Sequence, residues 1–165
     1  MKNILIVVVM IAVIVGLFLM LGASGGMVVV KEGNLKKLPL DIKVGHYQDS
    51  DCGMVIDDLA FSSQVVSPSG KTYFFHDHGG MAKWIKDKEF EKDAKMWVMT
   101  LDTKKYIDAK KAYYSLDDET PMGYGFGAYE NKKDGFIDFD EMQLKMLRGE
   151  TMNNPQIRKK LQGKS

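Results

Sequence analysis

The chain contains one cysteine, Cys52, so it can form neither an intramolecular disulfide nor a CxxC redox pair. It also lacks the Gly-x-Ser-x-Gly, His-Glu-x-x-His and P-loop motifs, and no other catalytic set of side chains emerges. The formal net charge is only +1, and basic residues are interspersed with acidic ones. Such a chain offers no electrostatic footprint for nucleic acid. We therefore predict a protein that is not an enzyme and has no nucleic-acid partner.

The chain does contain one long uncharged run, which extends from Ile4 to Ala23. At ~1.5 Å per residue this run is long enough to cross a bilayer core of roughly 30 Å. It is also longer than the apolar region of about 7–15 residues that is typical of a cleaved signal peptide. We therefore expect residues 1–24 to form a single-pass transmembrane anchor or an uncleaved signal. The flanking charges do not decide the orientation.

The remaining chain divides into a tether at residues 25–42, a folded domain at 43–148 and a flexible polar tail at 149–165. The domain begins with a β-hairpin, a helix and a strand, expected at residues 61–66, 71–75, 81–90 and 95–101. A weaker version of the same order follows, with strand-like segments at 105–116, 121–129 and 136–139 and a helix ending near residue 147. The pattern predicts an α+β fold of two related ββαβ units, the second degenerate, behind the N-terminal transmembrane helix.

Cys52 and Met54 are separated by a single glycine. Residues two apart on an extended segment point to the same face, so a thiolate and a thioether at these positions can meet one ion. Both are soft ligands of the kind that select copper(I), and the chain carries 12 methionines. The alternative is that Cys52 is a small buried residue beside a core methionine.

The segment His76-Asp77-His78-Gly79-Gly80-Met81 lies where a strand passes into a helix. His76 and His78 are candidate metal ligands there, and Met81 in the first helical turn adds a thioether. Alternatively, the segment serves only to start the helix. We expect Asp77 to be the N-cap residue.

Met122 stands between a proline and a glycine, on a turn where a core residue is unusual. It is a third candidate ligand, with an ordinary strand start as the alternative. Residues 130–141 resemble an EF-hand loop, but Lys132 occupies a position where a carboxylate ligand is needed. We expect a tight turn there and no calcium site.

Several motifs appear together in an order that resembles the nitrous oxide reductase accessory protein (NosL) family. The resemblance covers about residues 51–146, and the most specific motifs are the CGM, the IDA-x-x-A-x-Y segment and the T-PMG turn. The matching segments are CGMVIDD (52–58), SSQVVSPSGKTYFF (62–75), GM-x-x-W (80–84), YIDAKKAYYSL (106–116) and TPMGYGFGAYENKKDG (120–135).

The resemblance implies a copper(I)-binding chaperone or metallation accessory protein on the outer face of a bacterial cytoplasmic membrane. It implies that Cys52, Met54 and Met122 are copper ligands, with His76, His78 and Met81 secondary. The expected partners are copper donor and acceptor proteins, with nitrous oxide reductase or its ABC-type maturation complex as the client. The anchor then places this chain in the cell inner membrane, with its C-terminal domain in the periplasm. The alternatives are a thiol-dependent enzyme, lyase-like or redox, that uses Cys52, and a metal-free membrane adaptor.

Overall fold

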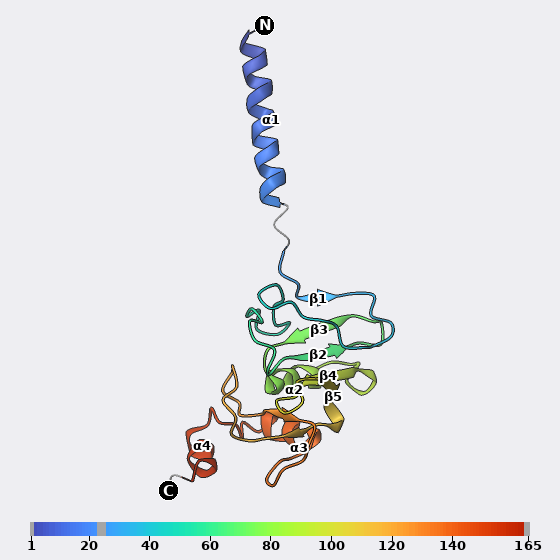
Figure 1. Cartoon of the computed structure of the whole chain (residues 1–165), viewed down its shortest axis with the longest axis vertical. Helices are drawn as coiled ribbons and strands as arrows, with labels where there is room; N and C mark the ends of the chain where they lie inside the picture. The colour runs from blue at the N-terminus through green and yellow to red at the C-terminus, as the bar shows by residue number, and fades with distance from the viewer. Residues whose placement is uncertain (1, 23–25, 164–165) are drawn as a thin grey trace.

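A computed structural model describes residues 2–22 and 26–163, and within the first helix it describes the side chains of residue 4 and residues 6–19. The α+β class predicted from the sequence is confirmed (Figure 1). The strands are β1 (Val30–Lys31), β2 (Ser63–Val66), β3 (Thr72–Phe75), β4 (Lys95–Met99), β5 (Tyr106–Asp108), β6 (Tyr113–Tyr114) and β7 (Ala128–Tyr129). The helices are α1 (Lys2–Gly22), α2 (His78–Lys86), α3 (Phe139–Leu147) and α4 (Pro155–Leu161), with short 3-10 helices at Glu91–Asp93 and Ala109–Lys111.

The first five strands form one antiparallel sheet in the order β1-β3-β2-β4-β5. The predicted hairpin is present, because Ser67-Pro68-Ser69-Gly70 turns β2 back onto β3. Gly70 adopts a φ of 82° in this turn, a value that favours glycine. β2, β3, α2 and β4 together make one ββαβ unit, as predicted.

The sheet has a separate hydrophobic core on each face, because side chains alternate along each strand. Val65, Phe75, Met96 and Val98 face α2 and α3, which supply Met81, Ile85, Met142 and Met146 to the larger core. Phe74 faces the opposite way, into a smaller core with Ile42, Tyr47 and Ile56. The segment from about residue 40 to residue 59 therefore forms an irregular layer over the second face of the sheet.

Hydrogen bonds attach this irregular layer to the sheet at two points. The buried amide of Gln64 on β2 both donates to and accepts from the backbone of Leu40, at 2.7 and 2.8 Å. Ser50 pairs with Phe74 in the same reciprocal way, through its backbone N–H at 2.7 Å and its hydroxyl at 2.9 Å. The second attachment brings residues 49–54 to the end of β3.

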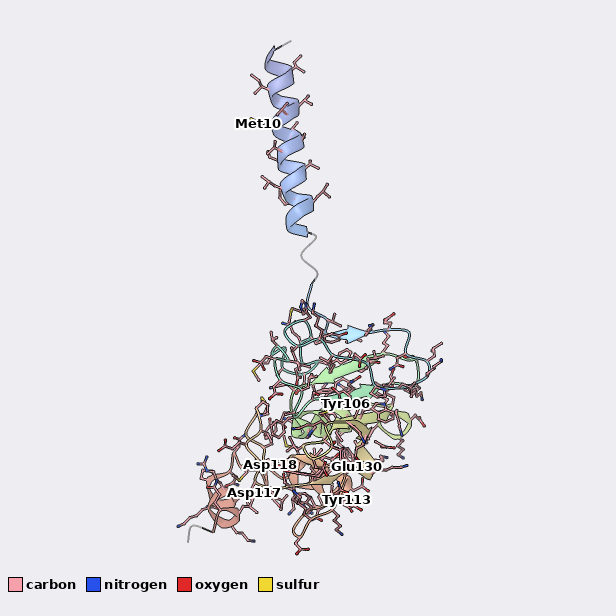
Figure 2. All side chains as sticks on the ribbon, in the orientation of Figure 1. Met10, Tyr106, Tyr113, Asp117, Asp118 and Glu130 are labelled. Carbon is pink, nitrogen blue, oxygen red and sulfur yellow. The ribbon has the colours of Figure 1, made fainter. Side chains whose placement is uncertain are left out.

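Helix α1 projects away from the sheet, and Figure 2 marks Met10 on it. Within the described residues, no helix is both long and apolar enough to cross a membrane. This finding corrects the predicted transmembrane helix. It also corrects the predicted single-pass location in the cell inner membrane with a periplasmic domain.

Up to residue 163, the second half of the chain does not form a second ββαβ unit. β5 extends the first sheet, whereas β6 and β7 form a separate two-stranded sheet, and Tyr114 of β6 also forms a bridge with Ile137. Backbone and side-chain hydrogen bonds together hold the glycine-rich segment between β6 and β7. The N–H groups of Ser115 and Asp118 donate to the carbonyls of Gly127 and Gly125. Thr120 Oγ1 accepts the N–H of Tyr124, and Ser115 Oγ accepts that of Gly127. α3 begins at the N-cap Asp138 and packs against α2.

Two regions outside the predicted domain contain regular structure. β1 lies in the predicted tether and pairs with β3 at the edge of the sheet. α4 lies in the predicted tail, capped by Asn154 with proline in its first turn. Residues 1, 23–25 and 164–165, where the anchor, tether and tail were expected to begin or end, lie outside the described residues.

Candidate metal centre

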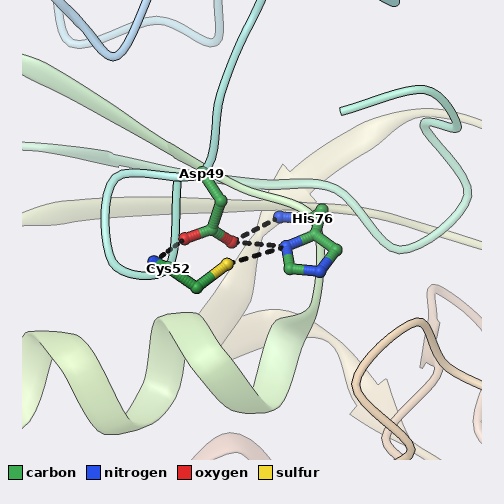
Figure 3. A group of neighbouring side chains, drawn as sticks. All are labelled: Asp49, Cys52 and His76. Atoms are coloured by element: carbon green, nitrogen blue, oxygen red, sulfur yellow. Dashed lines mark hydrogen bonds and ion pairs between the residues drawn. The ribbon is translucent and has the colours of Figure 1, made fainter. Parts of the chain in front are cut away.

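Asp49, Cys52 and His76 meet where the irregular layer contacts the end of β3 (Figure 3). His76 directly follows β3, and Asp49 and Cys52 belong to the loop that Ser50 attaches to that strand. The loop is tight, because Asp49 exchanges backbone hydrogen bonds with Gly53 and Met54. Gly53 has a φ of 76°, which the turn needs and which other residues rarely adopt. The three side chains offer one ligand atom each within 4.8 Å of one another.

Asp49 organises the group, because its buried carboxylate receives four contacts from N–H groups. Oδ1 accepts the backbone N–H of Asp51 at 2.8 Å and that of Cys52 at 3.1 Å. Oδ2 accepts the backbone N–H of His76 at 3.0 Å and lies 2.6 Å from His76 Nδ1. Burial acts to raise the pKa of Asp49, but these hydrogen bonds outweigh it and hold the pKa below its usual range. A carboxylate has about four lone-pair sites, so Asp49 is already saturated.

His76 presents Nδ1 to both of its partners in the group. The hydrogen bond to Asp49 raises the pKa of the imidazole, against the opposing effect of burial. The other ring nitrogen, Nε2, is buried and has no hydrogen-bond partner within the described residues. Nδ1 is therefore the ring nitrogen that both Cys52 and Asp49 contact.

Cys52 is exposed, and its Sγ lies 3.9 Å from His76 Nδ1. Partial desolvation of the sulfur raises the pKa of Cys52, and the charges of Asp49 and Asp51 add to this effect. Without a metal the side chain is therefore a neutral thiol at neutral pH. A bound metal ion reverses this preference, since it is the thiolate that coordinates.

The distance between sulfur and nitrogen suits two ligands of one ion. With bond lengths of about 2.3 Å to sulfur and 2.0 Å to nitrogen, such ligands lie roughly 3.5 Å apart at a tetrahedral ion and roughly 4.3 Å apart at a linear one. The observed 3.9 Å falls between these limits, so the separation is compatible with both atoms binding one ion.

The two predicted methionine ligands lie on different segments of the chain. Met54 belongs to the same loop as Cys52, and its side chain is 45% exposed. Met122 is half-buried on a turn 70 residues away in the sequence. Its backbone N–H donates to Asp77 Oδ2 at 2.9 Å, which brings the turn next to the residue that follows His76.

Tyr124 provides independent evidence that this turn is close to the metal centre. Its ring packs against the start of α2, so closely that a Cβ on Gly79 would lie 2.8 Å from it. Burial raises the pKa of the Tyr124 phenol, and the negative charges of Asp77, Asp51 and Asp49 raise it further. The carboxylates of Asp49 and Asp51 therefore lie close enough to Tyr124 for their charges to act on its phenol.

His78 and Met81, the other predicted ligands, lie in the protein interior. The Nδ1 of His78 pairs with Ser63 Oγ at 2.7 Å, and burial lowers the pKa of this imidazole to about 3. Met81 is fully buried in the larger core. The structure groups neither of them with Cys52. Asp77 is the N-cap of α2, as predicted, and its Oδ1 accepts the N–H of Gly79.

Asp49 was not predicted from the sequence, although it lies only three residues before Cys52. Its signal is an aspartate followed by a tight glycine turn, which is typical of a side chain that accepts local backbone N–H groups. The EF-hand-like segment forms a turn, as expected. Asp102 holds that turn by accepting the backbone N–H groups of Glu130 and Asn131.

Searches of the chain against models of protein families and against curated proteins find no match. The geometry of the Asp49–Cys52–His76 group and the sequence motifs therefore indicate what this protein can do.

Proposed function

We propose that this protein binds copper(I) at the Asp49–Cys52–His76 group and passes it to an acceptor protein by ligand exchange, without catalysis of its own. The observation that carries the proposal is the 3.9 Å separation of Cys52 Sγ and His76 Nδ1 around a saturated carboxylate. Thiolate and imidazole, with thioether, are the soft and borderline ligands that suit copper(I) better than hard cations.

The residues divide into ligands and a positioning group. On binding an ion, Cys52 would release its proton to solvent, and His76 would coordinate as a neutral imidazole that carries its one ring proton on Nε2 and has given up the Nδ1 proton to solvent. Asp49 still accepts three backbone N–H groups, so the loop and His76 keep their positions. Met54, in the Cys52 loop, and Met122, on the turn bonded to Asp77, would supply thioethers to complete the shell.

Transfer needs a site that an acceptor can reach, and the loop side of this group is open. Cys52 and Met54 are both exposed, whereas Asp49 and His76 are buried. An acceptor's ligands therefore approach the thiolate first and displace the protein's ligands one at a time. The resemblance to the NosL family makes nitrous oxide reductase the first acceptor to test.

The geometry disfavours the alternative of a thiol enzyme. In a catalytic triad the nucleophile and the carboxylate bind opposite nitrogens of the imidazole, so that one orients the base for the other. Here Cys52 and Asp49 both face Nδ1 of His76. The raised pKa of Cys52 also leaves no activated thiolate at neutral pH.

Anaerobic titration of the full chain with copper(I) against a competing chelator tests the proposal. Cys52→Ser removes the only thiol, and we expect it to weaken binding by more than the roughly 10–100-fold that loss of an outer-shell partner costs. His76→Gln should weaken binding as well. His46→Gln is the matched control, because His46 is an exposed histidine outside the group. The proposal fails if wild type binds no copper(I), or if Cys52→Ser binds it as tightly as wild type.

A further inference from the structure

Met122 lies on a turn whose own hydrogen bonds make it stiff. The N–H of Gly123 donates to the carbonyl of Thr120 at 2.8 Å, and the Thr120 hydroxyl accepts the N–H of Tyr124 at 3.0 Å. Gly123 has a φ of 67°, a left-handed conformation that favours glycine. These local hydrogen bonds therefore restrict the backbone at Met122 without any contribution from distant residues.

Two residues distant in sequence hold this turn from opposite sides of Met122. Asp77 Oδ2 accepts the N–H of Met122 at 2.9 Å, and Asn153 Nδ2 donates to its carbonyl oxygen at 2.7 Å. Asn153 also covers Gly123, since a Cβ there would lie 2.6 Å from Asn153 Oδ1. Both backbone polar groups flanking the methionine side chain are thus anchored.

Asp77 connects this turn to the metal centre. It is fully buried, and its two oxygens divide their roles, one accepting the N–H of Gly79 at the start of α2 and the other that of Met122. Asp77 also directly follows His76 in the sequence, so the residue next to the histidine fixes both the helix start and the turn. Capping alone needs only one of the two oxygens, and the second oxygen serves the turn.

We propose that Asp77 and Asn153 are positioning residues that hold Met122 beside His76 as a preformed arm of the metal site. This inference rests on the proposed function, because it concerns the same site. It predicts that the copper(I) affinity of a group centred on Cys52 depends on Asn153, which is 101 residues away in the sequence. A preformed thioether spares the site the entropy of ordering a loop when the ion binds.

The test is a double-mutant cycle measured by anaerobic copper(I) competition on the full chain. Asn153→Ala removes an exposed side chain, and Asp77→Asn keeps an oxygen for the cap while it replaces the acceptor of the Met122 N–H. We expect each change to weaken copper(I) binding by roughly tenfold, in the range for outer-shell partners. In a Met122→Leu background neither change should weaken binding further. Gln156→Ala, an exposed residue of α4, is the matched control and should bind like wild type.

The outcomes separate this inference from the proposed function. If wild type binds no copper(I), the proposed function fails. If wild type and Cys52→Ser differ as expected but Asn153→Ala binds normally, the positioning role alone is overturned. Equal losses from Asn153→Ala with and without Met122 would also overturn it, because the effect would then not pass through the thioether. If Asp77→Asn does not fold, the Asn153 and Met122 arms of the cycle still decide.

Discussion

Replacing Asp49 by asparagine should destabilise the folded protein even in the absence of metal. The introduced amide keeps an oxygen for the N–H groups of Asp51 and Cys52, but its amino group takes the place of Oδ2. In the native side chain, Oδ2 accepts the buried backbone N–H of His76 at 3.0 Å and pairs with Nδ1 at 2.6 Å. The variant therefore loses a charge-assisted hydrogen bond and leaves a buried donor without an acceptor.

The magnitude follows from these two losses. A hydrogen bond to a charged group contributes about 1.5–3 kcal/mol, and an unsatisfied buried donor costs about 1–3 kcal/mol. Because the two losses share one carboxylate oxygen, we expect the free energy of unfolding to fall by about 3 kcal/mol in total. A loss of this size corresponds to a decrease in Tm of roughly 10 °C for a domain of this size.

Urea unfolding followed by fluorescence of Trp84 and Trp97 measures this change. Asp51→Asn is the matched control, since Asp51 is an exposed carboxylate in the same loop, and its free energy of unfolding should stay within about 0.5 kcal/mol of wild type. If Asp49→Asn also stays within about 0.5 kcal/mol, the four contacts to Asp49 do not organise the site and the reasoning is refuted.

Three further predictions address the thiol, the start of α2 and the turn held by Asp102. Alkylation of Cys52 by iodoacetamide should be slow at neutral pH and accelerate only at a pH above the usual thiol range, because its pKa is raised; fast alkylation at neutral pH would contradict this. Gly79→Ala should destabilise the protein by about 1–3 kcal/mol, because the added Cβ overpacks against Tyr124. Gly80→Ala places its Cβ in open space and should stabilise the protein by up to about 1 kcal/mol. Equal urea midpoints for the two variants would exclude the close contact between Gly79 and Tyr124. Burial acts to raise the pKa of Asp102, but hydrogen bonds outweigh it and lower the pKa from 3.8 to about 2. The stabilisation by Asp102 is therefore complete above the unfolded pKa and is lost as pH falls toward about 2. The stability difference between wild type and Asp102→Ala should shrink between about pH 4 and about pH 2, and a constant difference in urea midpoints would refute this.

The first half of the domain could be predicted from the sequence because its signals are local. The Ser-Pro-Ser-Gly turn between two β-rich runs predicts the hairpin, and Asp77 before His78 and two glycines predicts the N-cap of α2. Both features depend on residues within a few positions of each other. Cys52 and His76 could likewise be predicted as candidate metal ligands from their immediate sequence neighbours.

The second half could not be predicted in the same way. Ser115, Thr120 and Asp102 hold its loops through side-chain hydrogen bonds to backbone groups, several of them far away in the chain, and such bonds leave no periodic pattern. The different environments of His76 and His78 could not be predicted for a similar reason. His76 and His78 are alike in the sequence, but the packing of the sheet against α2 buries His78 beside Ser63 and leaves His76 facing the Cys52 loop.

X-ray absorption of the copper(I)-loaded full chain, prepared anaerobically, tests the central claim most directly. We predict a first shell that contains sulfur and one imidazole nitrogen, with one sulfur lost in Cys52→Ser and the imidazole contribution lost in His76→Gln. A shell that stays the same in both variants would contradict the account, because the ion would then be bound outside the Asp49–Cys52–His76 group.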